Sequence, residues 1–167
     1  MLKPQDLLAA VRLAMPSSGG TTYPELAASL CMSASEVHAA IKRASQCGLV
    51  DEATRKAKRS ALLEFAVHGL RYVFPPSWSG VARGVPTSYA APPLNGSIAQ
   101  GDELPPVWPH PAGQVRGQGL RPLYRSVPDA ALRDADLYEW LALLDAIRAG
   151  RARERQLAVE LLRKRLT

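Results

Sequence analysis

Helical periodicity dominates the start of the chain. From Leu7 onward an apolar residue returns every three or four positions, and Pro4 stands just before this run, which predicts a helix that begins at the proline. The stretch 16–20 combines Pro, Ser and Gly and predicts the end of that helix. Residues 21–23 favour a short extended segment, and residues 24–30 give a second helix.

A third predicted helix is marked at both ends by local signals. Ser33 with Glu36 three residues later forms the capping-box pattern, and Gly48 stands where a helix commonly ends. The apolar positions between them form one stripe at helical spacing. They are Val37, Ala40, Ile41 and Ala44. We therefore predict a helix over 33–46 with one buried face.

The opposite face of this helix is small and polar, as a helix that reads DNA requires. A small side chain allows close approach, while Lys, Arg, Gln and His side chains reach phosphates or base edges. The candidate DNA-contacting residues of the segment are Ser33, Ser35, Glu36, His38, Ala39, Lys42, Arg43 and Gln46. The alternative is an ordinary amphipathic helix whose polar face is only solvated.

A basic cluster follows this helix. Residues 49–50 could begin a strand, and the next turn is crowded with cations, namely Arg55, Lys56, Lys58 and Arg59. Residues 61–68 return to a helical pattern. Helix, tight turn, capped helix and basic hairpin is the order of a winged helix-turn-helix domain, whose wing tip attracts phosphates. The cluster alone is equally compatible with a solvated surface, and winged helices also serve as protein-binding modules.

Residues 73–127 differ in composition from the rest. Most of the chain's 14 prolines lie here with many of its glycines, so regular helix is not expected. Aromatic residues are spread along the segment, and such side chains usually cover a surface. We predict an extended strap with short strands around 72–74 and 80–85, packed across the first region or a partner subunit. A disordered linker is the alternative.

Residues 128–167 are helical again. Asp134 or Asp136 can cap a helix that Gly150 interrupts before a second helix follows. The apolar stripe of the first of these helices is a candidate interface, formed by Leu137, Trp140, Leu141, Leu144 and Ile147. This stripe can equally close the protein's own core, pair two copies as a homodimer or bind another protein.

Composition and charge set the class of protein. The chain has 167 residues, 47% hydrophobic and 22% charged, with a net charge of +6, which is compatible with contact to a polyanion. No apolar run approaches the roughly 20 residues that cross a bilayer. The first residues lack the order of a signal peptide, so we expect a cytoplasmic protein without membrane contact.

Motifs for catalysis, metal or cofactor binding are not found in the sequence. The two cysteines, Cys31 and Cys47, are too few for a disulfide framework and have no zinc-ligand spacing with histidine. His38, His68 and His110 have no motif that links them to a nucleophile. No phosphate-binding glycine loop occurs. We therefore expect no enzyme, no metal and no cofactor.

The first seventy residues resemble the MarR-like winged helix-turn-helix regulators. The resemblance rests on Tyr23-Pro24-Glu25-Leu26-Ala27, Met32-Ser33-Ala34-Ser35-Glu36-Val37-His38, Ile41-Lys42-Arg43 and Gly48-Leu49-Val50. It implies a transcriptional regulator that binds double-stranded DNA as a homodimer on palindromic half-sites. The chain departs from the family at Cys31, where the turn usually holds glycine. A non-glycine residue in a left-handed turn costs roughly 1 kcal/mol.

Segments further along the chain resemble bacterial regulators encoded beside nucleotidyltransferase-like toxins of the abortive-infection type. The matching segments are 65–75, 83–87 and 150–155. This resemblance implies an antitoxin role, or a protein partner bound through the strap or the C-terminal helices. We therefore expect a mainly α fold with a small β-wing. Its parts are a winged helix-turn-helix domain at 1–72, the Pro/Gly-rich extended strap at 73–127 and C-terminal amphipathic helices at 128–167.

Overall fold

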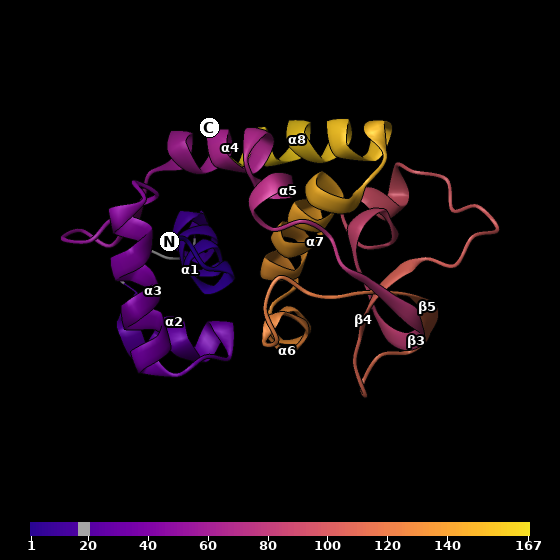
Figure 1. Ribbon diagram of the computed structural model, residues 1–167, viewed down its shortest axis with the longest axis horizontal. Coiled ribbons are helices and arrows are strands. Elements are labelled where there is room, and N and C mark those ends of the chain that lie inside the picture. Colours follow the sequence, from indigo (N-terminus) through magenta and orange to yellow (C-terminus); the bar gives the residue numbers. More distant parts are fainter. Residues whose placement is uncertain (17–20) are drawn as a thin grey trace.

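The computed structural model describes residues 1–16 and 21–167, so the predicted helix end at 16–20 lies, apart from Pro16, outside the described residues. Three helices begin the chain: α1 (Pro4–Ala14), α2 (Tyr23–Leu30) and α3 (Ala34–Gln46). An antiparallel hairpin of β1 (Val50–Asp51) and β2 (Lys56–Ala57) follows. Helix α3 and this hairpin lie at the left end of the molecule in Figure 1.

Helix shortens one segment predicted to be extended and replaces most of another. In the first, Thr21 and Thr22 lie outside any helix and Thr22 is extended, with φ −78° and ψ 164°. The Thr22 side chain accepts a hydrogen bond from the Glu25 N–H, and the Glu25 carboxylate accepts one from the Thr22 N–H, so α2 already begins at Tyr23. The predicted strand at 72–74 is also wrong. Those residues follow α4 (Arg59–His68) and belong to or end α5 (Leu70–Val73), because the buried Leu70 anchors one further helical turn.

The strap is ordered and forms a small sheet at the opposite end of the molecule (Figure 1). Its strands are β3 (Trp78–Pro86), β4 (Pro106–Pro109) and β5 (Val115–Leu120), with the 3-10 helices η2 (Ser88–Ala90) and η3 (Leu94–Gly96) before β4. Strand β3 confirms the strand predicted at 80–85. It pairs antiparallel with β4 and β5, which pair parallel with each other, so the sheet closes on itself.

Glycine makes this tight closure possible. A Cβ on Gly84 would lie 2.0 Å from the Trp108 carbonyl oxygen, and one on Gly117 would lie 2.2 Å from the Pro105 carbonyl oxygen. Both distances are far below van der Waals contact, so only residues without a side chain allow the backbones to approach so closely. The glycines that argued against regular helix in this segment are therefore the residues that permit its strands.

Three helices complete the chain, namely α6 (Val127–Arg133), α7 (Ala135–Ala149) and α8 (Ala152–Leu166). As predicted, Asp134 caps α7, accepting hydrogen bonds from the N–H groups of Asp136 and Leu137, and α7 ends at Gly150. Helix α7 runs through the middle of the molecule, with α5, α6, α8 and η2 against it. Side chains from all three predicted regions join one continuous core.

This central position corrects the predicted interface. The five stripe residues of α7, from Leu137 to Ile147, are between 0% and 3% exposed within the single chain. Their apolar faces are already covered by the chain's own helices, so they offer no free surface to a second copy or another protein. Of the alternatives open from the sequence, the stripe closes the protein's own core.

A buried ion pair ties the strap to α7. The Asp145 carboxylate, 1% exposed, accepts hydrogen bonds from Thr87 Oγ1 and Trp108 Nε1 at 2.7 Å each and pairs with Arg148 Nε at 2.7 Å. Arg148 Nη2 also donates to the Arg121 carbonyl at 2.7 Å. Both charges are thus neutralised and hydrogen-bonded, the condition under which a buried pair is tolerated. Asp145 and Arg148 are three residues apart on one helix, but the strap residues that complete the site are distant in sequence.

Cys31 occupies the left-handed turn between α2 and α3, with φ 53° and ψ 42°. Its N–H donates to the Ala28 carbonyl and the Met32 N–H donates to the Ala27 carbonyl, which is the hydrogen-bond pattern that ordinarily takes glycine. We expect the substitution Cys31→Gly to raise the free energy of unfolding by up to about 1 kcal/mol, because it removes the left-handed strain.

Urea denaturation of the two cysteine variants checks this expectation. Cys47 ends α3 with a right-handed φ of −86°, so Cys47→Gly gains no relief of strain and is expected to lower the free energy of unfolding. Equal losses of stability in both variants would contradict the assignment of strain to Cys31.

Candidate nucleic-acid interface

Helix α3 has well-defined ends. The Ser33 hydroxyl accepts a hydrogen bond from the Glu36 N–H, and the Glu36 carboxylate accepts one from the Ser33 N–H at 2.9 Å. At the other end Gly48 adopts φ 78°, and the Leu49 N–H donates to the Ala44 carbonyl at 2.9 Å. The predicted capping box and glycine stop are confirmed. A helix fixed at both ends can hold its outer side chains in one orientation.

The outer face of α3 carries few charges. Helical spacing puts Ser35, Ala39, Lys42 and Gln46 on one line, called here the outward stripe, opposite the buried Val37 and Ile41. Ser35, Lys42 and Gln46 are exposed, and Ala39 is half-buried. The predicted apolar stripe is confirmed, since all four of its members are at most 1% exposed.

One flank of α3 faces the start of α2. His38 stacks on the Tyr23 ring with 4.8 Å between ring centroids, and the Arg55 guanidinium lies 5.1 Å from the centroid of the same ring. Arg55 comes from the turn of the β1–β2 hairpin. Tyr23 therefore links the hairpin to α3 and brings His38 and Arg55 to one surface. The sequence did not single out Tyr23.

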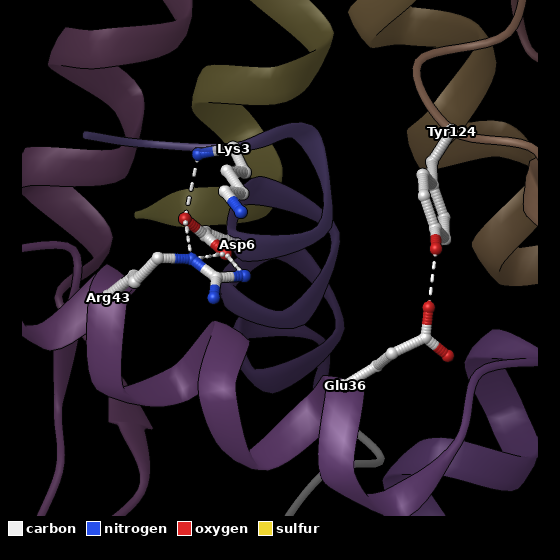
Figure 2. Close-up of polar contacts among 5 residues, drawn as sticks. All are labelled: Lys3, Asp6, Glu36, Arg43 and Tyr124. Atoms are coloured by element: carbon white, nitrogen blue, oxygen red, sulfur yellow. Dashed lines mark hydrogen bonds and ion pairs between the residues drawn. The ribbon is translucent and has the colours of Figure 1, made fainter.

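The other flank of α3 is held by the strap. The Tyr124 hydroxyl donates a hydrogen bond to the Glu36 carboxylate (Figure 2). Arg125 Nη2 lies 3.3 Å from the same Glu36 oxygen. The Arg125 side chain is otherwise 79% exposed. The strap thus adds a cation at the start of α3, on the side away from Tyr23. Nothing in the local sequence predicted this contact.

The carboxylate of Glu36 is stabilised as an anion. The hydrogen bond from Tyr124, followed by those from the Ser33 N–H and hydroxyl, lowers the pKa of Glu36 to about 2. The same hydrogen bond raises the pKa of Tyr124. Glu36 is therefore negatively charged at neutral pH and engaged on both sides. The structure does not present Glu36 as a free DNA-contacting group.

Because the pKa of Glu36 is lowered, the free energy of unfolding depends on pH in the acidic range. Between the ordinary pKa of 4.5 and about 2, the unfolded chain binds a proton at Glu36 that the folded chain does not, so stability falls as pH falls through that window. We expect Glu36→Gln to reduce the change in the free energy of unfolding across this pH range. Tyr124→Phe should raise the pKa of Glu36 in the folded protein, so the lower end of the range moves up. Urea denaturation from pH 5 to pH 2 measures this. Identical pH profiles for Glu36→Gln and the unchanged protein would contradict it.

Arg43 points inward, toward α1, rather than outward (Figure 2). Its Nη2 and Nε lie 2.7 Å and 3.0 Å from Asp6 Oδ1, and the Lys3 N–H donates to Asp6 Oδ2 at 2.7 Å. Asp6 is fully buried while Arg43 is 25% exposed. The ion pair locks α3 against α1, so the expected DNA contact of Arg43 gives way to a structural one. A carboxylate on the inner face of α1 was the clue in the sequence.

The basic cluster also contains both exposed cations and one cation that makes a structural hydrogen bond. Lys56 and Lys58 are exposed, and Arg55 is half-buried against Tyr23. The guanidinium of Arg59 donates to the Ala14 carbonyl at 2.6 Å, which closes the end of α1. Three of the four cations therefore remain near the outer surface of the hairpin. Of the predicted residues in α3, Ser35, His38, Ala39, Lys42 and Gln46 share the outer face, while Ser33 serves as the N-cap.

Both ring nitrogens of His110 have hydrogen-bond partners. His110 Nε2 lies 2.8 Å from Asp129 Oδ1, and His110 Nδ1 accepts a hydrogen bond from the Ala112 N–H at 3.0 Å, so both ring nitrogens are engaged. Within residues 1–16 and 21–167, no group of three or more His, Cys, Asp or Glu side chains could hold a metal ion. No helix in that part of the chain is long and apolar enough to cross a membrane.

In comparisons with known proteins, no protein-family model, curated protein or solved structure matches this chain.

Proposed function

We propose that this protein binds duplex DNA and regulates transcription, with α3 in the major groove. The observation that carries the proposal is the outward stripe of α3, which stays exposed while the chain braces the helix on both flanks. A cation stands on each flank of the helix, with Arg55 of the hairpin turn against Tyr23 and Arg125 of the strap beside Glu36, and Lys56 and Lys58 are exposed next to Arg55 along the chain. A groove-reading helix needs this combination of a free outer face and flanking phosphate contacts.

In this proposal the N-terminal helices and the hairpin act as a winged helix-turn-helix domain of the MarR-like kind. Helix α2 braces α3, and the short β1–β2 hairpin serves as the wing. Lys42 and Gln46 contact base edges, and the hairpin cations contact phosphates. Arg43 and Glu36 act as positioning residues, since their partners Asp6 and Tyr124 fix the direction of α3.

Lys42 is the only cation of the outward stripe, which makes its replacement informative. We expect Lys42→Ala to weaken binding to a sequence selected by the protein by about 1–3 kcal/mol and to relax the base preference at one position. Lys164→Ala is the matched control, because Lys164 is equally exposed but lies on α8. Fluorescence anisotropy with the selected duplex measures both. Equal losses in the two variants would refute base reading by α3.

We further propose that two copies bind palindromic half-sites, since one small reading helix makes few specific contacts. The dimer surface lies outside the α7 stripe. Sedimentation at micromolar concentration, with and without the selected duplex, tests this. We expect each duplex to carry two chains of 18.0 kDa, and a complex with one chain per duplex overturns the proposal.

Protein binding is the second candidate function, as expected of an antitoxin or interaction module. It is favoured by exposed apolar side chains at the sheet end of the molecule, since Trp78 and Val81 are each 49% exposed and Leu104 is 40% exposed. A pull-down from the native host, with and without nuclease, separates the two candidates. DNA enrichment supports the regulator, whereas a stoichiometric protein that survives nuclease supports the interaction module.

A further inference from the structure

A shallow hollow lies between the start of α2 and the outer face of α3. It opens widely to solvent, has a volume of about 560 Å³ and is lined mainly by apolar surface, with Tyr23, Pro24, Ala34 and Ala39 as its apolar and aromatic members. The polar members of the lining are Ser35, His38 and Lys42. The hollow therefore lies on the flank that Tyr23 and Arg55 share, directly beside the outward stripe.

The apolar lining restricts what this hollow can take from DNA. Phosphates are strongly hydrated anions, and burying one against carbon surface carries a large desolvation cost. Among the groups that base pairs present in the major groove, only the 5-methyl group of thymine is apolar. Small side chains such as alanine are the usual partners of this methyl group, because they let the helix backbone approach it closely.

The position of the hollow agrees with this choice. The thymine methyl group stands on the edge of the groove that faces the backbone of its own strand. The hollow shares Tyr23 with Arg55, so we place the methyl group and the phosphate that Arg55 contacts on the same strand. Ala39 and Lys42 are three residues apart, so they lie on adjacent turns of one face and reach neighbouring base pairs.

We propose that this hollow receives the 5-methyl group of a thymine in each half-site, with Lys42 donating to a guanine beside it. The inference rests on the proposed function and deepens it, since it names the base step that α3 reads. Tyr23 and Ala39 become specificity-determining residues, the first as the wall of the hollow and the second as its floor.

The test uses the full-length protein and duplexes selected by it from a random library. Each thymine of the selected half-site is replaced in turn by deoxyuridine, which removes only the methyl group. One thymine in each half-site is expected to show about four-fold weaker binding on loss of its methyl group, while thymines in the flanks show no change. The substitution Ala39→Ser, which places a hydroxyl in the hollow, is expected to bring the thymine-to-uracil ratio close to one.

The possible outcomes distinguish failure of the thymine-methyl site from failure of DNA binding itself. Tight binding of a selected duplex that tolerates every deoxyuridine within two-fold overturns the methyl site and leaves DNA binding intact. The same holds if Ala39→Ser keeps the full thymine preference while circular dichroism shows it folded. Failure to enrich any duplex overturns the DNA-binding proposal and this inference together.

Discussion

Replacing Asp145 with alanine is expected to lower the free energy of unfolding by about 3–5 kcal/mol. The change leaves the Arg148 guanidinium buried without a counter-charge, and it removes the acceptor of Thr87 Oγ1 and Trp108 Nε1. Because these donors lie on the strap, the loss separates the strap from α7. Urea denaturation followed by tryptophan fluorescence measures it, since one of the chain's three tryptophans, Trp108, lies at this site.

An exposed ion pair provides the control for this substitution. Arg151 and Glu103 lie 2.7 Å apart, but their side chains are 75% and 67% exposed. We expect Glu103→Ala to change stability by less than about 1 kcal/mol, as is usual for solvated pairs. A change below 1 kcal/mol for Asp145→Ala as well would show that the buried pair does not hold the strap in place.

The second large effect is expected in DNA binding. We predict that replacing Arg55, Lys56 and Lys58 together by glutamine makes the slope of log affinity against log salt less steep by about 2–3, since each phosphate contact contributes about 0.9. Arg59 is left unchanged because it supports the Ala14 carbonyl. The loss should be alike for selected and unrelated duplexes, because phosphate contacts carry no base information.

A second basic triple tests whether position or charge alone matters. Arg153, Arg163 and Lys164 are exposed on α8, so their replacement removes the same charge from another face. We expect the α8 triple to leave the salt slope nearly unchanged. A larger effect from the α8 triple than from the hairpin triple would move the nucleic-acid surface to α8.

Local signals explain what the sequence predicted well. Ser33, Glu36 and Gly48 act on backbone groups within a few residues, so the ends of α3 could be read without knowing the fold. The cap of α7 at Asp134 is of the same kind. A left-handed turn at Cys31 was expected only from the family resemblance, and the structure has φ 53° there.

Contacts between distant segments explain what the sequence did not reveal. Arg43 and Asp6 are 37 positions apart, and Glu36 and Tyr124 are 88 apart. On a helical projection Arg43 and Glu36 fall on one flank of α3, beside the outward stripe, and only the partners that meet them in the fold turn them into positioning residues. The outer face of α3 is therefore narrower than the sequence suggested.

Burial of α7 illustrates the same limit. An apolar stripe at helical spacing predicts a covered face, but it does not identify what covers it. Here α5, α6 and α8 of the same chain cover Trp140 and its neighbours, and the strap contributes the buried hydrogen bonds to Asp145. The strands of the strap pack closely only because glycines such as Gly84 have no side chain. The periodicity of apolar residues does not reveal such close backbone approaches.

If α3 and the hairpin form the DNA-contacting face, amide chemical-shift mapping by NMR will show it when a selected duplex is added to the ¹⁵N-labelled protein. We expect the largest shifts at Ser35, Ala39, Lys42 and Gln46 and at the hairpin residues 52–58, with small shifts along α8. Shifts concentrated on α8 or on the sheet end around Trp78, with α3 unaffected, would contradict it.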